Sequence, residues 1–443
     1  MGKYFGTDGI RGKANSELTV KTAFKVGQAL GNLYTKQKIV IGMDTRISSG
    51  MLKNALCAGL SASGADAYDM NVVPTPTVAY ITANQDFICG VMISASHNPY
   101  YDNGIKIFNH QGVKIDDQIE AKIEAYLDDE YTIPYSQESE IGKIISYPEG
   151  IVLYADYLLS LFPLDLSHLR IAIDAANGSA SHIAYAILNQ LKAQCFIINN
   201  TPDGLNINHL CGSTHPETLQ KFTVENKCDI GLAFDGDADR LIVVDHLGHL
   251  VNGDKMLYMN ALAMQAKGQL SQDTIVTTVM ANLGLFKALQ KKGIHSEITQ
   301  VGDKYVYDKM QNAELMLGGE QSGHIIFKHH MTTGDGLLSA LKCLEIMLES
   351  KQSLEELGKD CIIYPQYLKN IRVNDKLETI NNPKITQLVS SIETALGSDG
   401  RILVRPSGTE PLIRVMVEAI DFNTCTSYVN QVIQLIIDEG LSI

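Results

Sequence analysis

Hydrophobic and polar positions along the chain follow an order that occurs three times. Each copy has a short apolar run, a helix-length stretch, a second apolar run, a second helix-length stretch and a third apolar run. A polar loop and a fourth apolar run complete the copy. The copies begin near Lys38, Leu169 and Thr274. Apolar runs that alternate with helical stretches are typical of α/β units, so we predict three similar α/β domains with mixed sheets.

In the first copy, the pattern predicts the bounds of each strand and helix. The expected strands and helices cover, in order, 38–43, 50–63, 66–72, 76–84, a strand that ends before Ser96, and 104–108. A polar loop follows the third apolar run in every copy: SASHNP at 94–99, DGDADR at 235–240 and GEQSGH at 319–324. Equivalent loops leave equivalent edges of their sheets, where ligands bind in α/β folds. We therefore predict a central cleft to which each loop contributes.

The pattern changes after about residue 366. A strand near 401–404, the segment RPSGTEP (405–411), the strand RVMVEA and a helix at about 424–438 predict a smaller α+β domain. Polar stretches near 130–148 and 365–370 are predicted linkers. The four predicted domains cover 1–148, 149–253, 254–366 and 367–443.

Composition and charge narrow the class of protein. With 443 residues and 45% hydrophobic content, the chain is long enough for several cores. Its net charge of −14 argues against a nucleic-acid or membrane-surface binder, because both need a basic footprint. Eight cysteines without a CxxC pair are typical of reduced thiols, and no apolar stretch matches a signal sequence or a membrane span. We predict a cytoplasmic protein without nucleic-acid or membrane partners.

The run GVMISASHNP (90–99) is the strongest local signal for chemistry. It ends a strand at small and polar residues, which makes Ser96 a candidate nucleophile at a strand end. Ordinary turn chemistry explains Ser-x-Ser and Asn-Pro equally well. Ser94 is a rival nucleophile on chemical grounds alone.

Three carboxylates alternate in the second polar loop. Asp235, Asp237 and Asp239 offer hard oxygen ligands that suit Mg²⁺, and acids this close repel one another without a cation. Asx turns that cap the strands are the alternative reading. The loop is no EF-hand, because Arg240 stands at the sixth position, where an EF-hand has glycine.

Phosphorylation of Ser96 would connect these two loops. A phosphoserine would supply a further oxygen to the metal, and His97, Lys106 and Arg240 would balance its charge. Lys106 lies at an alternate position of the following strand. It is either a general acid/base or an ordinary surface lysine.

Two further segments carry ligand-binding chemistry. Glu320 and Ser322 lie between glycines, as in a loop that reads sugar hydroxyls, and a tight hairpin is the alternative. The segment 405–411 combines a guanidinium, hydroxyls and a glycine, which suits a phosphate; an exposed loop is the alternative.

Five motifs together resemble the α-D-phosphohexomutase superfamily, and within it the bacterial phosphoglucosamine mutase branch. They are YFGTDGIRG (4–12), ISASHNPYYDNGIKIF (93–108), CGSTHPE (211–217), DGDADR and GGEQSGH. The resemblance covers essentially the whole chain. Phosphomannomutase/phosphoglucomutase relatives more often have Met at the position of Gln321.

The resemblance implies an isomerase that interconverts glucosamine 6-phosphate and glucosamine 1-phosphate for UDP-N-acetylglucosamine and peptidoglycan synthesis. Phosphoserine at Ser96 would give and take back a phosphoryl group through a bound glucosamine 1,6-bisphosphate, or glucose 1,6-bisphosphate as activator. In chain order, the domains would carry the phosphoserine, the Mg²⁺, the sugar and the non-reacting phosphate. Hinge motion of the fourth domain and a homodimer formed through the first domain are further expectations.

The resemblance also assigns roles to individual residues. The implied catalytic residues are Ser96, Lys106, His97 and Arg11, and the metal ligands are Ser96, Asp235, Asp237 and Asp239. The implied substrate-binding residues are Arg240, Lys304, Glu320, Ser322, Arg405, Ser407, Gly408 and Thr409. Lys304 departs from the family, which commonly has Arg there, so a bidentate grip is lost.

Other functions remain open at this stage. The chain could prefer mannose or glucose phosphates within the same superfamily, or act as an Mg²⁺-dependent sugar phosphatase that releases phosphate without a bisphosphate. A silent sugar-phosphate sensor would need a damaged nucleophile or metal loop, and neither is seen.

Overall fold

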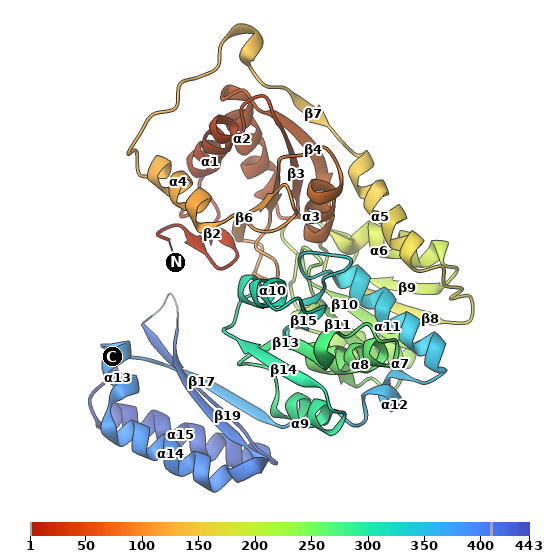
Figure 1. The fold of residues 1–443 in the computed structure, drawn as a ribbon, viewed down its shortest axis with the longest axis vertical. Coiled ribbons are helices and arrows are strands. Elements are labelled where there is room, and N and C mark those ends of the chain that lie inside the picture. Colours follow the sequence, from red (N-terminus) through yellow and green to blue (C-terminus); the bar gives the residue numbers. More distant parts are fainter. Residues whose placement is uncertain (1, 408–410) are drawn as a thin grey trace. The chain divides into compact units, whose positions relative to one another are not determined.

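The computed structural model describes residues 2–407 and 411–443, which form two compact units. The first unit comprises Met1–Met280 and Gly293–Lys359, and the second comprises Ala281–Lys292 and Asp360–Ile443. Figure 1 shows the elements of both. No helix among the described residues is long and apolar enough to cross a membrane.

The first unit contains the same four-stranded arrangement three times. The strands of the first repeat are β3 (Lys38–Met43), β4 (Asp66–Val72), β5 (Cys89–Ile93) and β6 (Asp102–Asn109). Those of the second are β8 (Arg170–Asp174), β9 (Gln194–Ile198), β10 (Ile230–Phe234) and β11 (Leu241–Asp245). Those of the third are β13 (Thr274–Thr278), β14 (His295–Thr299), β15 (Leu317–Gly319) and β16 (Ile325–Phe327).

Strand pairing is identical in the three repeats. The first strand pairs in parallel with the second and the third, and the fourth runs antiparallel to the third. The prediction of three similar α/β domains with mixed sheets is therefore confirmed. In each repeat the polar loop joins the third strand to the antiparallel fourth strand, so the three loops hold equivalent positions.

Additional strands extend two of the sheets. The first sheet has the order β1-β2-β6-β5-β3-β4-β7, with β1 at Phe5–Gly6, β2 at Gly9–Lys13 and β7 at Ile144–Ser146. The second gains β12 (Leu250–Val251). Arg11 of β2 pairs with Gly104, and Lys106 of β6 pairs with Met92 of β5. This register places both cations close to the point where β5 ends before Ser96.

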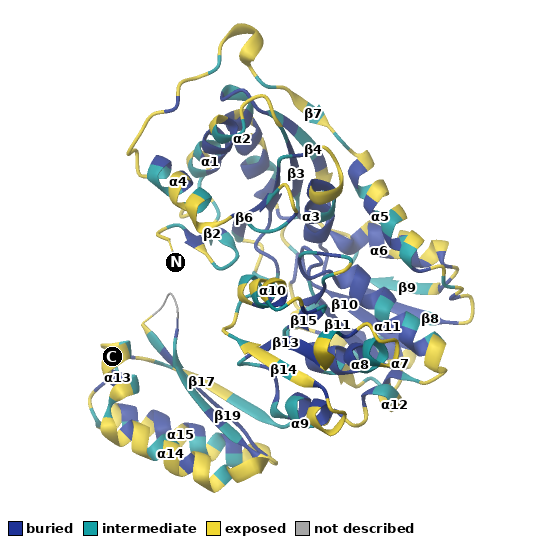
Figure 2. Ribbon diagram, viewed as in Figure 1, coloured by how far each residue is buried: buried dark blue, intermediate teal, exposed yellow. Residues whose placement is uncertain are grey.

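Helices cover the sheets of the first unit. They are α1 (Val20–Leu33), α2 (Ser49–Ala62), α3 (Thr75–Asn84), α4 (Asp117–Leu127), α5 (Glu149–Leu161), α6 (Ala180–Gln190), α7 (Glu217–Glu225), α8 (Gly253–Ala266), α10 (Asp303–Asn312), α11 (Gly336–Ser350) and α12 (Leu354–Gly358). Because helices pack on the sheet faces, the central strands β5, β10 and β11 are buried at every position. Figure 2 shows this for β10 and β11. Strands buried on both faces read as continuous apolar runs, which explains the strong sequence signal.

The second unit contains the predicted smaller α+β domain together with the segment Ala281–Lys292, which the sequence pattern assigns to the third copy. Its antiparallel sheet has the order β17-β19-β18, formed by Gln366–Arg372, Leu412–Glu418 and Arg401–Pro406. Its helices are α9 (Leu283–Lys291), α13 (Lys376–Asn381), α14 (Pro383–Leu396) and α15 (Phe422–Asp438). The buried Glu418 carboxylate accepts hydrogen bonds from the Leu283 amide (2.9 Å) and from Arg401 Nε (2.7 Å), which joins the start of α9 to the sheet.

The linker prediction at 365–370 is wrong. Those residues begin β17, whose Gln366 pairs with Glu418 of β19. The strand is half exposed and carries polar residues such as Lys369 and Asn370, so it lacks the apolar run that marks a buried strand. The predicted linker at 130–148 holds a short 3-10 helix (Glu138–Glu140) and β7, which adds an edge strand beside β4.

Candidate active site

Two of the predicted loops meet at Ser96. This residue follows β5, is 1% exposed, and its Oγ donates a hydrogen bond of 2.6 Å to Asp235 Oδ2. The two residues are 139 positions apart in the chain. The structure thus brings the predicted nucleophile of the first repeat onto the predicted metal loop of the second.

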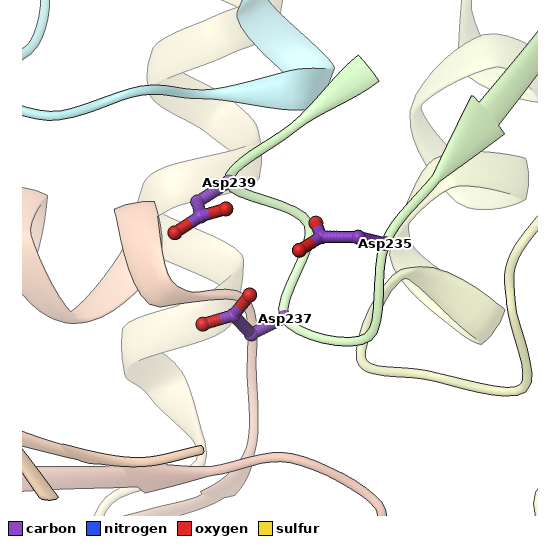
Figure 3. Close-up of side chains that lie close together, drawn as sticks. All are labelled: Asp235, Asp237 and Asp239. Carbon is purple, nitrogen blue, oxygen red and sulfur yellow. The ribbon is translucent and has the colours of Figure 1, made fainter. Parts of the chain in front are cut away.

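The three aspartates form one compact group. Their ligand oxygens lie within 4.8 Å of one another, all three residues are buried, and the side chains point into one small space (Figure 3). Ala238 adopts a positive φ of 56° and donates its amide to Asp235 O at 3.1 Å. This turn lets Asp235, Asp237 and Asp239 converge.

The donor set fits a hard divalent cation. Asp237 Oδ1 and Asp239 Oδ1 are buried and have no hydrogen-bond partner among the described residues, which is costly for carboxylate oxygens. Burial and then the charges of Asp239 and Asp237 raise the pKa of Asp235 well above its usual value. Oxygen ligands with open coordination positions are what Mg²⁺ prefers.

Lys106 lies against the same carboxylates. Its Nζ is 2.8 Å from Asp237 Oδ2, 3.0 Å from Asp239 Oδ2 and 3.2 Å from Asp8 Oδ2, and the side chain is 1% exposed. Burial opposes the positive charge, but these three carboxylates outweigh it and hold the pKa of Lys106 well above its usual value. Lys106 is therefore a buried ammonium in the site and not a surface lysine.

Asp8 is a site residue that the sequence analysis did not single out. It accepts hydrogen bonds from Arg11 Nη2 and from Lys114 Nζ (2.5 Å), in addition to its contact with Lys106. Lys114 also pairs with Asp303 of the third repeat. Asp8 therefore anchors the two predicted cations Arg11 and Lys106, and its place in the motif YFGTDGIRG was the only available signal.

His97 and Arg240 flank the serine and the acidic loop. His97 Nδ1 is 3.3 Å from Ser96 Oγ, and Arg240 donates its amide to Asp235 Oδ1 at 3.2 Å. Burial and the neighbouring Arg240 and Arg11 lower the pKa of His97 to about 3. The role predicted for His97, to balance the charge of a phosphorylated Ser96, stays a prediction.

The third polar loop joins the same group. Glu320 accepts hydrogen bonds from the Gly302 amide (3.1 Å) and from Ser322 Oγ (3.4 Å), and its own backbone closes a hairpin with His324. The Leu241 amide, just after the acidic loop, donates to Gly323 O at 3.1 Å. The predicted sugar loop and the predicted metal loop are thus in direct backbone contact.

His324 is a second residue that sequence reasoning missed, although it belongs to GEQSGH. It is buried, and its Nδ1 lies 3.7 Å from Asp239 Oδ1. Its Nε2 accepts the Gly334 amide at 2.9 Å. This hydrogen bond places the ring proton on Nδ1, facing Asp239.

Of the remaining predicted residues, one belongs to the first unit, two belong to the second, and two lie outside the described residues. Lys304 Nζ pairs with Asp117 of α4 at 2.6 Å and makes no described contact with Glu320 or the acidic loop. In the second unit, Arg405 lies opposite Arg414 on paired strands, and Ser407 donates its amide to Leu412 O at 2.8 Å. Gly408 and Thr409 lie outside the described residues.

Fold and site together define an enzyme of the α-D-phosphohexomutase class, in which a strand-end serine faces a carboxylate loop between repeated α/β domains. Sequence profiles of one family cover nearly the whole chain. Those of phosphoglucomutase/phosphomannomutase α/β/α domains I, II and III match residues 2–133, 153–248 and 252–363, and that of the C-terminal domain matches 368–434. The chain belongs to the phosphoglucomutase/phosphomannomutase family.

Similar proteins agree with this assignment. Phosphoglucosamine mutase of Lachnospira eligens is 50% identical over 450 residues, which span 100% of both chains. Phosphoglucosamine mutase of Shouchella clausii is 48% identical over 440 residues, 98% of this chain and 99% of the relative.

Solved structures share the fold. A phosphoglucomutase/phosphomannomutase family protein from Burkholderia thailandensis superposes with a TM-score of 0.79 at 24% identity, covering 97% of this chain and 96% of the other. Aspergillus fumigatus N-acetylphosphoglucosamine mutase, in complex with GlcNAc-6P and magnesium, has a TM-score of 0.70 at 18% identity and covers 99% and 96%.

Proposed function

We propose that the protein is a phosphoglucosamine mutase that interconverts glucosamine 6-phosphate and glucosamine 1-phosphate. The observation that carries the chemistry is the buried Ser96 hydroxyl, 2.6 Å from the carboxylate loop that also contacts Lys106. The choice of substrate rests on relatives of 48–50% identity over the whole chain, which are named phosphoglucosamine mutase.

Asp235, Asp237, Asp239 and a phosphorylated Ser96 would hold Mg²⁺. When bound, the ion would neutralise charge on the transferring phosphoryl group. The orphaned oxygens of Asp237 and Asp239 support this ligand set. Phosphoryl transfer depends mainly on alignment and charge neutralisation, and the buried carboxylates and Lys106 suit both requirements.

In the forward step, a sugar hydroxyl attacks phosphorus, the new oxygen–phosphorus bond forms, and the bond from phosphorus to Ser96 Oγ breaks. Lys106, a buried ammonium, is proposed to give a proton to Ser96 Oγ as its bond to phosphorus breaks, and to take up the proton that the attacking sugar hydroxyl loses. The second step reverses these bonds at the other end of the bound bisphosphate and restores phosphoserine. Arg11, which shares Asp8 with Lys106, would contribute positive charge beside the phosphoryl group.

Glu320 and Ser322 are the proposed readers of sugar hydroxyls. The two side chains are partly exposed, and the hydrogen bond between them fixes their relative orientation. Arg240 would contact the substrate from the end of the acidic loop. Lys304 stays a proposed substrate contact, although its partner here is Asp117.

In the second unit, Arg405 and Ser407 are proposed to hold the non-reacting phosphate, together with Gly408 and Thr409. Burial and the facing Arg414 lower the pKa of Arg405, which marks two facing guanidinium groups that an anion would stabilise. Motion of this unit, a homodimer, a cytoplasmic location and the domain boundaries stay predictions.

The proposed activator is glucosamine 1,6-bisphosphate or glucose 1,6-bisphosphate. A solved structure of a serine-to-alanine variant of the Aspergillus fumigatus enzyme holds glucose 1,6-bisphosphate, which supports a bisphosphate on this fold.

The test is direct. Purified protein with Mg²⁺, glucosamine 6-phosphate and a trace of glucose 1,6-bisphosphate is followed by ³¹P NMR, beside parallel reactions with mannose and glucose phosphates. The expected result is glucosamine 1-phosphate without inorganic phosphate. Release of inorganic phosphate with no isomer would identify a phosphatase instead, and a clear preference for mannose phosphate would refute the choice of substrate.

A further inference from the structure

The loop that carries Ser96 has a strained backbone. Ser96 has a φ of 53°, in the left-handed region, which is costly for a non-glycine residue. Within the loop its amide donates to Ser94 Oγ at 2.9 Å. Hydrogen bonds from residues outside the loop must therefore help to stabilise the left-handed conformation of Ser96.

The side chains of Arg46 and Asn208, from different parts of the chain, donate hydrogen bonds to the same two carbonyl oxygens of this loop. Arg46 Nη2 donates to Ser96 O at 3.0 Å and to Asn98 O at 2.5 Å. Asn208 Nδ2 donates to the same two oxygens, at 2.9 Å and 3.1 Å. These four hydrogen bonds fix the carbonyl groups of Ser96 and Asn98, the residues before and after His97.

Arg46 is itself held rigidly. It follows β3 in the first repeat, and its guanidinium is paired through Nη1 with Asp44, both side chains being fully buried. Asp44 also accepts hydrogen bonds from Ser49 Oγ (2.7 Å) and from the Arg46 amide (3.0 Å). A buried ion pair adds little net stability, whereas a fixed planar donor suits the orientation of a loop.

Asn208 belongs to the second repeat, between β9 and α7. It too has a positive φ, 58°, which asparagine tolerates better than most residues, and its amide donates to Ala176 O at 2.9 Å. Gly236 of the acidic loop lies directly beside it. A Cβ on Gly236 would lie 2.7 Å from Ser96 O and 2.8 Å from Asn208 Nδ2.

We infer that Arg46 and Asn208 are positioning residues for phosphoryl transfer. They clamp the Ser96 loop in its left-handed conformation and set the position of Ser96 Oγ against Asp235. Because Asn208 comes from the second repeat, the loop is fully held only while the first two repeats are docked. The inference rests on the proposed function, since it assigns a role in that reaction.

The experiment compares substitutions at Asn208 with a matched control. Asn208→Gly keeps the positive φ accessible but removes the amide, and Asn208→Asp keeps the shape but cannot donate. Arg46→Lys keeps the charge beside Asp44 and loses the planar fork. The control is Thr45→Val, which removes another contact between the first two repeats, Thr45 Oγ1 to Asn177 O at 2.6 Å, without touching the Ser96 loop.

We would measure kcat and KM for glucosamine 6-phosphate with each full-length variant. Intact mass gives the phosphorylated fraction, and thermal unfolding gives the midpoint. A misplacement near 1 Å reduces transfer by about 100-fold, so kcat of the Asn208 and Arg46 variants should fall by roughly 30- to 100-fold. Their KM should stay within about 3-fold, because no substrate group is lost. Thr45→Val should keep kcat within about 3-fold, even where its unfolding midpoint falls as far as that of Asn208→Gly.

Two results would overturn the inference. One is a kcat of Asn208→Gly and Asn208→Asp within about 2-fold of the unsubstituted protein, and the other is an equal loss in Thr45→Val. If Arg46→Lys does not fold, the Asn208 pair still decides. Failure of the proposed function looks different, because the unsubstituted protein would then form no glucosamine 1-phosphate from glucosamine 6-phosphate.

Discussion

Asp335 provides a stability prediction that the structure makes quantitative. Its side chain is fully buried at the start of α11, where Oδ1 accepts the Leu338 amide (2.9 Å) and Oδ2 accepts the hydroxyl of the buried Tyr154 (2.7 Å). Burial raises the pKa of Asp335 from 3.8 to about 6. At neutral pH the folded protein therefore carries a buried carboxylate that would be more stable in water.

The raised pKa of Asp335 determines how its contribution to stability changes with pH. The folded state binds the proton more tightly than the unfolded state, so this group favours folding below pH 3.8 and loses that contribution as the pH rises to about 6. A shift of about 2 pKa units corresponds to about 3 kcal/mol at about 1.36 kcal/mol per unit. Asn at 335 can still cap α11, and Tyr154 can reverse its hydrogen bond to accept from the amide.

We therefore expect Asp335→Asn to unfold with a free energy about 1–3 kcal/mol higher than the unsubstituted protein at about pH 7.5, a difference that shrinks toward zero at about pH 4. The assay is urea unfolding at several pH values, with the transition of the first unit analysed separately. Asp335→Ala is the control, because it removes the same charge but also the cap and the partner of Tyr154. Parallel pH profiles for Asp335→Asn and the unsubstituted protein would refute the reasoning.

Three further predictions concern the site and the second unit. Ser96→Ala should abolish enzyme phosphorylation and nearly all mutase activity, whereas Ser94→Ala should still gain the mass of one phosphoryl group on incubation with glucose 1,6-bisphosphate; the reverse mass result would move the nucleophile to Ser94. Removal of divalent cations with EDTA should reduce turnover at least about 100-fold and Mg²⁺ should restore it, since uncompensated carboxylates would face the phosphoryl group; full activity in EDTA would contradict the metal assignment. Glu418→Ala should destabilise the second unit by about 3–5 kcal/mol, because it leaves Arg401 without its buried partner, and an unchanged unfolding curve would contradict this account.

The sequence predicted the fold best where strands are buried on both faces. The strands β3, β10 and β13 are buried at most or all of their positions, and each belongs to a different repeat. The pattern did not reveal β17, whose exposed polar positions resemble a loop. The sequence analysis also did not predict the helices α8 and α11. Both are buried over much of their length, so their sequences lack the alternation of apolar and polar faces that marks a surface helix.

The sequence predicted that the polar loops share one cleft, but it did not predict the individual contacts between them. Local composition marks Ser96 and the acidic loop, but nothing local shows that Ser96 Oγ and Asp235 lie 2.6 Å apart. Asp8, Asn208 and His324 act through partners far away in the chain, such as Lys106, Ser96 and Asp239. Such pairings are set by how the repeats dock, which hydrophobic periodicity does not encode. The charge state of His97 likewise depends on burial, which sequence alone does not give.

Packing between the repeats requires glycine at two positions in the polar loops. Gly236 separates two of the aspartates, and the side chain it lacks would collide with Ser96 O, the backbone of another repeat. Gly323 has a φ of 90°, and a Cβ there would lie 1.9 Å from Leu241 O, at the far end of the acidic loop. Each glycine is required by a neighbour's backbone and not by the turn of its own loop alone. The acidic loop therefore contacts both neighbouring repeats: Ser96 O of the first lies against Gly236, and Gly323 of the third lies against Leu241. The positions of its three carboxylates depend on how both repeats pack against it.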